Sequence, residues 1–338
     1  MKKGIAVAGN LIIDYYKEID VYPEHSTLTT INQVRSATGG AVCNCAIDLA
    51  KIDGNLRITA IGVLGEDEAG SMVLSELNKY PNISTSQITR EGVTSYTDVY
   101  VDRTNHTRTF FQFRGANQIL GIKHFDFEKI NADILHIGYI LLLDSLDKED
   151  EEYGTVMARL LHQAKLSGLK TSIDVVSEQS ERYKLLVPPA LKYCDYCIIN
   201  EIEGSRTTGI KIRDEKGRLI EGNGFKICQA LLDMGVSEWA VIHMREGAIG
   251  ISKDGESVSL PSLDIPSESI LSSTGAGDAF LSGMLYGAWK GNNLTKAIEL
   301  GLATATMSLL GANACDGVGS EAEARAFYEE TPKEKWIF

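Results

Sequence analysis

The residues best suited to chemistry lie between Ile270 and Gly283, where small residues and glycines precede an acid and a long apolar-periodic run. From Thr274 to Gly277 several backbone N–H groups can point outward together, and the positive end of the following helix adds to them. Asp278 falls in the first turn of that helix, where the dipole favours a carboxylate by ~0.3–1 kcal/mol. Ionised, it can accept a proton from a hydroxyl. The stretch predicts a phosphate-binding loop with a catalytic base.

A plainer role suits the same residues equally well, because Asp278 can simply complement the dipole of a capped helix start. The spacing does exclude two commoner phosphate loops. No Gly-Lys-Ser/Thr follows, as a P-loop requires, and no third glycine completes a dinucleotide fingerprint. A dehydrogenase is therefore disfavoured.

A second group of residues suits a polyhydroxylated ligand. Gly39 and Gly40 precede an expected helix and leave bare backbone that a ligand can approach, while Asn44, one turn later, offers a donor and an acceptor. Asp14 follows the strand expected at Ile5 to Ala8, so we expect it outside the carboxyl end of that strand, where open α/β sheets bind ligands. A plain loop and a turn residue are the competing interpretations.

Two further positions fit a nucleotide. Asn200 and Glu203 are three residues apart, on one face of a helical segment, and could hold a hydrated Mg²⁺ through water. Helix capping is the competing account. His243 ends a strand, where either a nucleotide or a satisfied edge histidine can lie.

The elements that must position these residues form two patterns. From residue 118 onward strands alternate with helices, which predicts a parallel sheet covered on both faces. Residues 15–37 and 93–114 alternate with a period of two, as a small half-exposed sheet does. Strands are expected near 133–138, 170–175, 196–199, 239–242, 249–252 and 257–260, and helices near 151–167, 181–192, 224–235, 278–290 and 294–310.

Charge and cysteine content narrow the class of protein. The chain has 338 residues and a net charge of −13, from 46 acids and 33 bases, which argues against nucleic-acid and anionic-membrane surfaces. Six cysteines are too sparse for a disulfide scaffold. The longest apolar run, Ile137 to Leu143, is far short of the ~20 residues that span a bilayer. We expect a reduced, cytoplasmic protein with no membrane partner.

The motifs occur in one order: Gly-Gly-x-x-x-Asn-x-Ala early, Asn-x-x-Glu in the middle and Gly-Ala-Gly-Asp-Ala-Phe late. Over nearly the whole chain this resembles the PfkB/ribokinase family of carbohydrate kinases. The resemblance implies a ribokinase-like three-layer α/β/α sandwich, with a mostly parallel central sheet and a small protruding β lid. The core would comprise residues 1–14, 38–92 and 115–338, and the lid residues 15–37 and 93–114.

The resemblance also implies transfer of the γ-phosphoryl group of ATP to a sugar hydroxyl, with Mg²⁺. Asp278 would be the base, and Gly275, Ala276 and Gly277 the anion hole. Substrate hydroxyls would contact Asp14, Gly39, Gly40 and Asn44, while the nucleotide side would use Asn200, Glu203, His243, Gly247 and Thr274, with Glu203 serving the metal through water. Many members use a monovalent cation near this motif, and we expect a homodimer formed through the lid.

Substrate choice and one departure leave alternatives open. Arg114 resembles the arginine that ketose and keto-acid sugar kinases place near their substrate, so a ketose or 2-keto-3-deoxy sugar acid comes first and a ribose-type sugar second. Tyr16 and Phe113 keep a nucleoside kinase open, because they can border a base. Ser272 and Ser273 replace the family's usual Asp-Thr, which motivates a third alternative, a sugar-binding protein that has lost catalysis.

Overall fold

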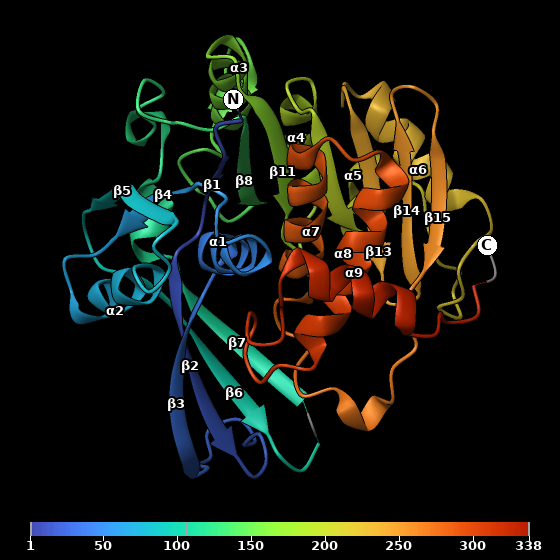
Figure 1. Cartoon of the computed structure of the whole chain (residues 1–338). Coiled ribbons are helices and arrows are strands. Elements are labelled where there is room, and N and C mark those ends of the chain that lie inside the picture. Colours follow the sequence, from blue (N-terminus) through green and yellow to red (C-terminus); the bar gives the residue numbers. More distant parts are fainter. Residues whose placement is uncertain (1, 106, 337–338) are drawn as a thin grey trace.

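The computed structural model describes residues 2–105 and 107–336. Its main sheet has the strand order β15-β14-β13-β12-β11-β8-β1-β4-β5 (Figure 1). Neighbouring strands run parallel, except that β14 pairs antiparallel with both β13 and β15. The strands are β1 (Ile5–Ala8), β4 (Ile58–Leu64), β5 (Ile83–Arg90), β8 (Ile134–Ile140), β11 (Lys170–Val175), β12 (Tyr196–Asn200), β13 (Trp239–Met244), β14 (Gly247–Ser252) and β15 (Ser257–Pro261).

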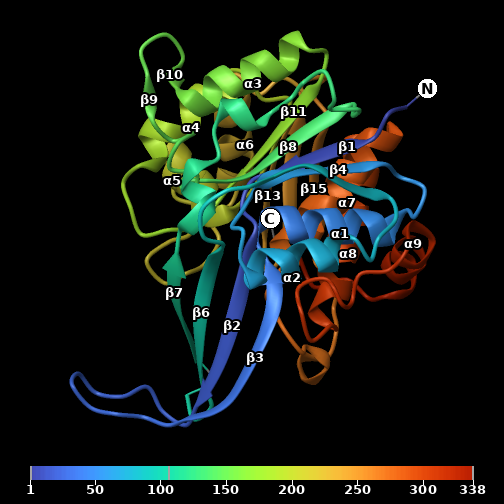
Figure 2. The same ribbon diagram turned by 90° about the vertical axis from the view of Figure 1, so that its left-hand side faces the viewer.

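Helices cover both faces of this sheet, because its strands send alternate side chains into two separate cores. In β1, Ile5 and Val7 enter one core and Ala6 and Ala8 enter the other. Figures 1 and 2 show the two helical layers. One layer holds α1 (Ala41–Ile52), α2 (Glu68–Leu77), α7 (Ala276–Lys290), α8 (Leu294–Leu309) and α9 (Glu321–Glu330), and the other α3 (Val156–Leu166), α4 (Tyr183–Leu191), α5 (Glu201–Thr208) and α6 (Asn223–Asp233).

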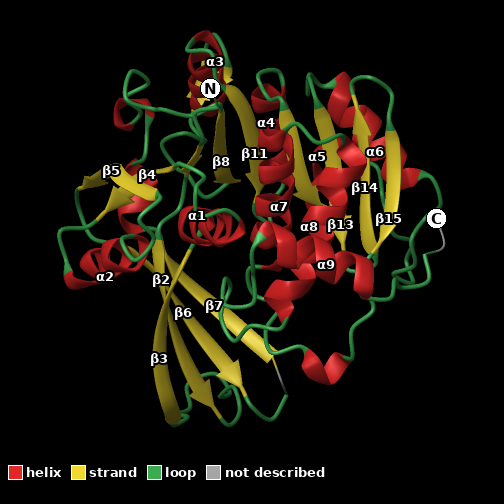
Figure 3. Ribbon diagram, viewed as in Figure 1, coloured by secondary structure: helices red, strands yellow, loops and turns green. Residues whose placement is uncertain are grey.

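The predicted three-layer sandwich is confirmed, with local differences (Figure 3). The helix expected from residue 151 begins at Val156, because β9 (Glu149–Asp150) and β10 (Gly154–Thr155) form a short hairpin before it. The side chain of Thr155 then accepts from the N–H of Ala158 and caps the helix. Within the described ranges, no helix is long and apolar enough to cross a membrane.

A second sheet, of order β3-β2-β6-β7, extends away from the main body (Figures 1 and 2). Its strands are β2 (Ile12–Ile19), β3 (Ile31–Gly39), β6 (Ser95–Asp102) and β7 (Thr107–Phe113). Asp14 lies beyond the carboxyl end of β1, as expected, but inside β2, opposite Ala37 and Thr97, and so not in the core that was expected to include residues 1–14. The chain passes from β1 into β2 almost directly, so Asp14 belongs to the second sheet.

Candidate active site

Polar side chains gather where four neighbouring strands of the main sheet end. Tyr139, Asp174, Asn200 and His243 lie at or near the carboxyl ends of β8, β11, β12 and β13. These strands are parallel, so the four residues share one edge of the sheet. The start of α7 faces the same edge across a cavity of about 220 Å³, which is lined by Tyr139, Asp174, Val175, Val176, Ser177, Ile198, Asn200, Glu203, His243, Gly275, Gly277, Asp278 and Leu281.

Asp278 is the acid best placed for proton transfer. Its carboxylate is 6% exposed and accepts hydrogen bonds from Asn44 Nδ2, at 2.8 Å, and from the Tyr139 hydroxyl, at 2.9 Å from each oxygen. Burial raises the pKa of Asp278 to about 6, while the bonds from Asn44 and Tyr139 act in the opposite direction. The group is therefore mostly ionised at neutral pH and can accept a proton.

The loop before Asp278 is shaped by Gly275, which begins α7 with φ of +84°. A side chain there would also collide, since an added Cβ would lie 2.5 Å from the Cβ of Ala314. No side chain in the described ranges caps the first turn of α7. Its N–H groups, including those at Ala276 and Gly277, are thus left for an anion at the cavity.

Tyr139 holds Asp278 from an unusual backbone conformation and is a residue that the sequence analysis missed. Its φ is +67°, in a region that costs of order 1–3 kcal/mol for a bulky residue. The backbone N–H of Tyr139 donates to Asp174 Oδ1 at 2.6 Å, which helps fix this conformation. The only hint in the sequence is that a hydroxyl interrupts an apolar run.

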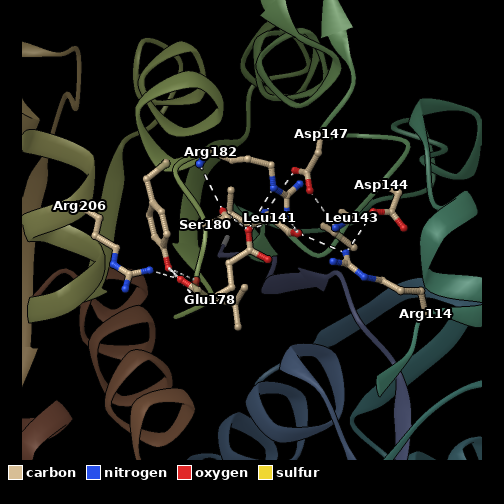
Figure 4. Close-up of polar contacts among 11 residues, drawn as sticks. Arg114, Leu141, Leu143, Asp144, Asp147, Glu178, Ser180, Arg182 and Arg206 are labelled. Carbon is tan, nitrogen blue, oxygen red and sulfur yellow. Dashed lines mark hydrogen bonds and ion pairs between the residues drawn. The ribbon is translucent and has the colours of Figure 1, made fainter. Parts of the chain in front are cut away.

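The loop after Tyr139 is held by several side chains (Figure 4). Leu141 also has a positive φ, of +86°, and its carbonyl accepts from Arg114 at 3.2 Å and from Arg182 at 2.8 Å. Asp147 accepts from the N–H groups of Leu141 and Leu143. Arg114 further pairs with Asp144 at 3.1 Å, so its guanidinium is engaged by this loop.

For Asn200 and Glu203 the sequence left two roles open, helix capping and a place in a nucleotide site, and their positions are compatible with both. They form a capping box at the start of α5, and both line the cavity. Ser177, which the sequence analysis did not single out, donates to Glu203 Oε1 at 2.9 Å and accepts from Asn200 Nδ2 at 2.8 Å. Burial raises the pKa of Glu203 to about 7 against the effect of these hydrogen bonds.

The cavity suits a metal that keeps most of its water. Within residues 2–105 and 107–336 no three His, Cys, Asp or Glu side chains are grouped to hold an ion. Asp174, Glu203 and Asp278 nevertheless line the cavity with no Lys or Arg among its lining residues. Mg²⁺ is commonly bound by one or two carboxylates together with water and phosphate oxygens, so this acidic lining fits it.

His243 and Gly247 occupy different surroundings. The ring of His243 packs on Phe280, with centroids 4.9 Å apart, and burial lowers its pKa to about 4, so the ring is neutral. Gly247 begins β14 against Trp336 and is not among the residues lining the cavity. His243 therefore adjoins the predicted phosphate region, while a nucleotide contact at Gly247 stays a prediction.

The second sheet brings the remaining predicted residues near α7. Burial raises the pKa of Asp14 to about 6. An added Cβ at Gly39 would lie 2.5 Å from Asp14 Oδ2, and one at Gly40 would lie 2.5 Å from the carbonyl oxygen of Asn10. Both glycines thus allow close packing where β3 meets α1. Thr274 Oγ1 accepts from Arg108 Nη1 of β7 at 2.7 Å, which links the second sheet to the loop before α7.

Comparison with known proteins finds relatives along almost the whole chain. A "Nucleoside kinase" of Methanocaldococcus jannaschii is 23% identical over 306 residues, with 89% of each chain covered. A "5-dehydro-2-deoxygluconokinase" of Clostridium beijerinckii is 24% identical over 347 residues, covering 98% of this chain and 95% of the relative. The match therefore includes both sheets.

Solved structures agree on the fold. Ribokinase from Thermotoga maritima superposes with a TM-score of 0.79 at 21% identity, and Arabidopsis thaliana ribokinase, complexed with ribose and ATP, with 0.78 at 18%. Each alignment covers 97% of this chain and 99% of the other. The family model described as pfkB family carbohydrate kinase matches residues 2–319. With this match across both sheets and the α7 loop, the chain belongs to the pfkB family of carbohydrate kinases, phosphotransferases that act on a sugar hydroxyl.

Proposed function

We propose that this kinase transfers the γ-phosphoryl group of ATP to a hydroxyl of a sugar or sugar acid, with Asp278 as the general base. The observation that carries the proposal is a buried carboxylate one turn into α7, directly after a glycine loop whose N–H groups are uncapped. Phosphoryl transfer needs positioning and charge stabilisation more than covalent chemistry, and this arrangement offers both.

The residues of the chain would act in a simple order. The substrate hydroxyl binds beside Asp278 and transfers its proton to a carboxylate oxygen. The oxygen of the substrate attacks the γ-phosphorus, the bond to the bridging oxygen breaks, and ADP carries away the electron pair. N–H groups from Gly275 to Gly277 stabilise the negative charge on the transferred group, and Asp278 later releases its proton to solvent.

Asn200, Glu203 and Ser177 form the other wall of the cavity and would order the water around the phosphates. Mg²⁺, when bound there with Glu203 as a partner through water, would neutralise phosphate charge. A monovalent cation near α7 is a further expectation from the family. Asp14, Gly39, Gly40 and Asn44 would surround the acceptor on the side of the second sheet.

A ketose or a 2-keto-3-deoxy sugar acid is the first candidate acceptor and a ribose-type sugar the second. The name of the Clostridium beijerinckii relative supports a sugar acid. The name of the Methanocaldococcus jannaschii relative keeps a nucleoside as the alternative. Against a nucleoside, Phe113 packs on Tyr96, with centroids 5.2 Å apart, on the face of the second sheet opposite to that of Asp14. It is therefore not available to stack on a base beside Asp14.

We propose that residues 15–37 and 93–114 act as a lid over the acceptor and as the interface of a homodimer. The contact between Arg108 and Thr274 supports the first role. Exposed apolar side chains support the second, since Leu28 is 89% exposed and Phe111 50% exposed.

The test is ADP release from Mg·ATP across ketoses, sugar acids, pentoses and nucleosides, with wild type, Asp278→Asn and Asp254→Asn. Asp254 is an exposed acid between β14 and β15 and serves as the control. We expect Asp278→Asn to lower kcat by roughly 10²–10⁴ and Asp254→Asn to leave it unchanged. Full activity in Asp278→Asn would exclude the assigned base. No turnover on any acceptor, with saturable sugar binding, would favour a protein that has lost catalysis.

A further inference from the structure

The face of the second sheet that carries Asp14 also carries two arginines. Cross-strand pairing sets Tyr16 opposite Arg35 of β3, and Val101 opposite Arg108 of β7. Because side chains alternate along a strand, Arg35 and Arg108 lie on the same face as Asp14 and Tyr16. The contact from Arg108 to Thr274 shows that this face is turned toward the loop before Asp278.

Arg35 packs on Tyr16, and Arg108 reaches Thr274, which also shares a hydrogen bond with the Tyr16 hydroxyl. The Arg35 guanidinium carbon lies 4.4 Å from the centre of the Tyr16 ring, a cation–π distance. Burial, and after it the charge of Asp14, raises the pKa of the Tyr16 hydroxyl above its ordinary value, and the positive charges of Arg108 and Arg35 oppose that rise. Tyr16 is 8% exposed, so its ring is a well-packed support for the Arg35 guanidinium.

Neither arginine has an acidic partner among the residues that the structure describes. Most other arginines of the second sheet and the adjoining loops are engaged: Arg103 lies 3.9 Å from Glu18, and Arg114 pairs with Asp144. Asp14 and Glu18 lie on this face as well, but among the described residues neither forms an ion pair with Arg35 or Arg108, so both guanidinium groups can donate to an anionic ligand.

The geometry points to Arg35 and Arg108 as a subsite for an anionic group of the acceptor, a carboxylate or a phosphate away from the hydroxyl that is phosphorylated. This inference rests on the proposed function. The anion belongs to the acceptor and not to ATP, because both arginines come from the sheet of Asp14 and neither lines the cavity of Asn200 and Glu203. Asp14 would take hydroxyls of the same molecule, and the arginines its charged end.

The experiment compares acceptors that differ only in charge. Probes are gluconate and 2-keto-3-deoxygluconate, each with its carboxamide, and fructose 6-phosphate with fructose. Each is assayed for ADP release with wild type, Arg35→Gln, Arg108→Gln and the control Arg103→Gln, whose side chain is 61% exposed at the β6–β7 turn. Thr274→Val separates loss of the loop contact from loss of the Arg108 charge.

We expect wild type to prefer an anionic probe over its neutral partner by about 10- to 100-fold in kcat/KM, as charge-assisted hydrogen bonds allow. Arg35→Gln should remove most of that preference through KM while leaving the neutral probe and the KM for ATP unchanged. Arg108→Gln also breaks the contact with Thr274, so it should weaken the anionic probe beyond the loss that Thr274→Val shows on either probe. The acid or the phosphate that shows the effect identifies the anion.

Three outcomes overturn the inference: no preference for charge in wild type, an equal loss on neutral and anionic probes, or a rise in the KM for ATP. The last would place the arginines on the nucleotide. If no acceptor turns over, the proposed function fails instead, and stabilisation of the protein by acids over amides, measured by thermal shift without ATP, still tests the subsite.

Discussion

Replacing Tyr139 by Phe removes one hydroxyl and tests whether the Tyr139 bond sets the ionisation of Asp278. The hydroxyl lies 2.9 Å from both carboxylate oxygens, and the pKa of Asp278 is raised to about 6 by burial. A hydrogen bond to a charged group contributes about 1.5–3 kcal/mol. Loss of that contribution from the ionised form corresponds to about 1–2 pKa units. We expect the pKa of Asp278 in the variant to lie near 7–8.

The assay is the pH dependence of kcat/KM with the best acceptor, because this parameter reports ionisation of the free enzyme. A base works only when ionised, so its activity rises as pH passes upward through its pKa. The Tyr139→Phe curve should therefore move to higher pH. At pH 6 the variant should lose about 5- to 50-fold in kcat/KM, and near pH 9 it should approach wild type.

A matched control separates this effect from loss of stability. Tyr286 lies on α7 as well, is 1% exposed and donates to Asp53 at 3.0 Å and Glu321 at 2.7 Å. Tyr286→Phe also removes a buried hydroxyl bonded to carboxylates, but away from the cavity. Its pH profile should match wild type. A Tyr139→Phe loss that is the same at every pH would refute the argument and leave Tyr139 a packing residue.

Three further predictions concern stability and assembly. Because burial raises the pKa of Asp278 in the folded protein to about 6, ionisation of this carboxyl lowers the stability of wild type as pH rises from about 4 to 6. Asp278→Asn lacks this loss. In urea unfolding, the free energy of unfolding of the variant relative to wild type should therefore be about 2–3 kcal/mol higher at pH 8 than at pH 4. Gly275→Ala should abolish activity and destabilise by more than Gly291→Ala, which has a similar φ at the other end of α7 but open space around its Cβ. Leu28→Glu with Phe111→Glu should convert a dimer to a monomer in light scattering, and an unchanged mass would exclude a lid interface.

Helices and strands could be predicted from the sequence where their apolar residues recur with a clear period. Elements without such a period were missed. The strand β5 lies at the edge of the sheet, and only two of its residues, Ile83 and Gln87, are buried. The helix α9 buries Ala324 alone among its residues and is otherwise charged or partly exposed. Neither shows the apolar periodicity on which such predictions rest.

Some residues of the candidate site could likewise be predicted from the sequence and others could not. Asn44 and Asp278 are 234 positions apart, yet each stands one turn into a helix that follows a glycine, and a parallel sheet brings such helix starts to one edge. Tyr139 was not accessible, because its hydroxyl reaches Asp278 only through a positive φ held by Asp174. The Arg114 side chain likewise points toward the loop after β8, because it donates to the Leu141 carbonyl there. The conformation of that loop could not be predicted from its local sequence.

Three acidic side chains lie close together around the cavity, and their proximity is unfavourable for the folded protein. Burial raises the pKa of Asp174, Glu203 and Asp278, and the charge on Asp278 raises the pKa of the other two further. Among the residues that the structure describes, no Lys or Arg side chain lines the cavity to offset this repulsion. A core chosen for stability alone would avoid such a cluster, whereas a site that binds a cation together with phosphates, as we propose for this one, gains from it. The strained backbone at Tyr139 and the capping box of Asn200 are then the means by which the fold holds three buried acids close together around the cavity.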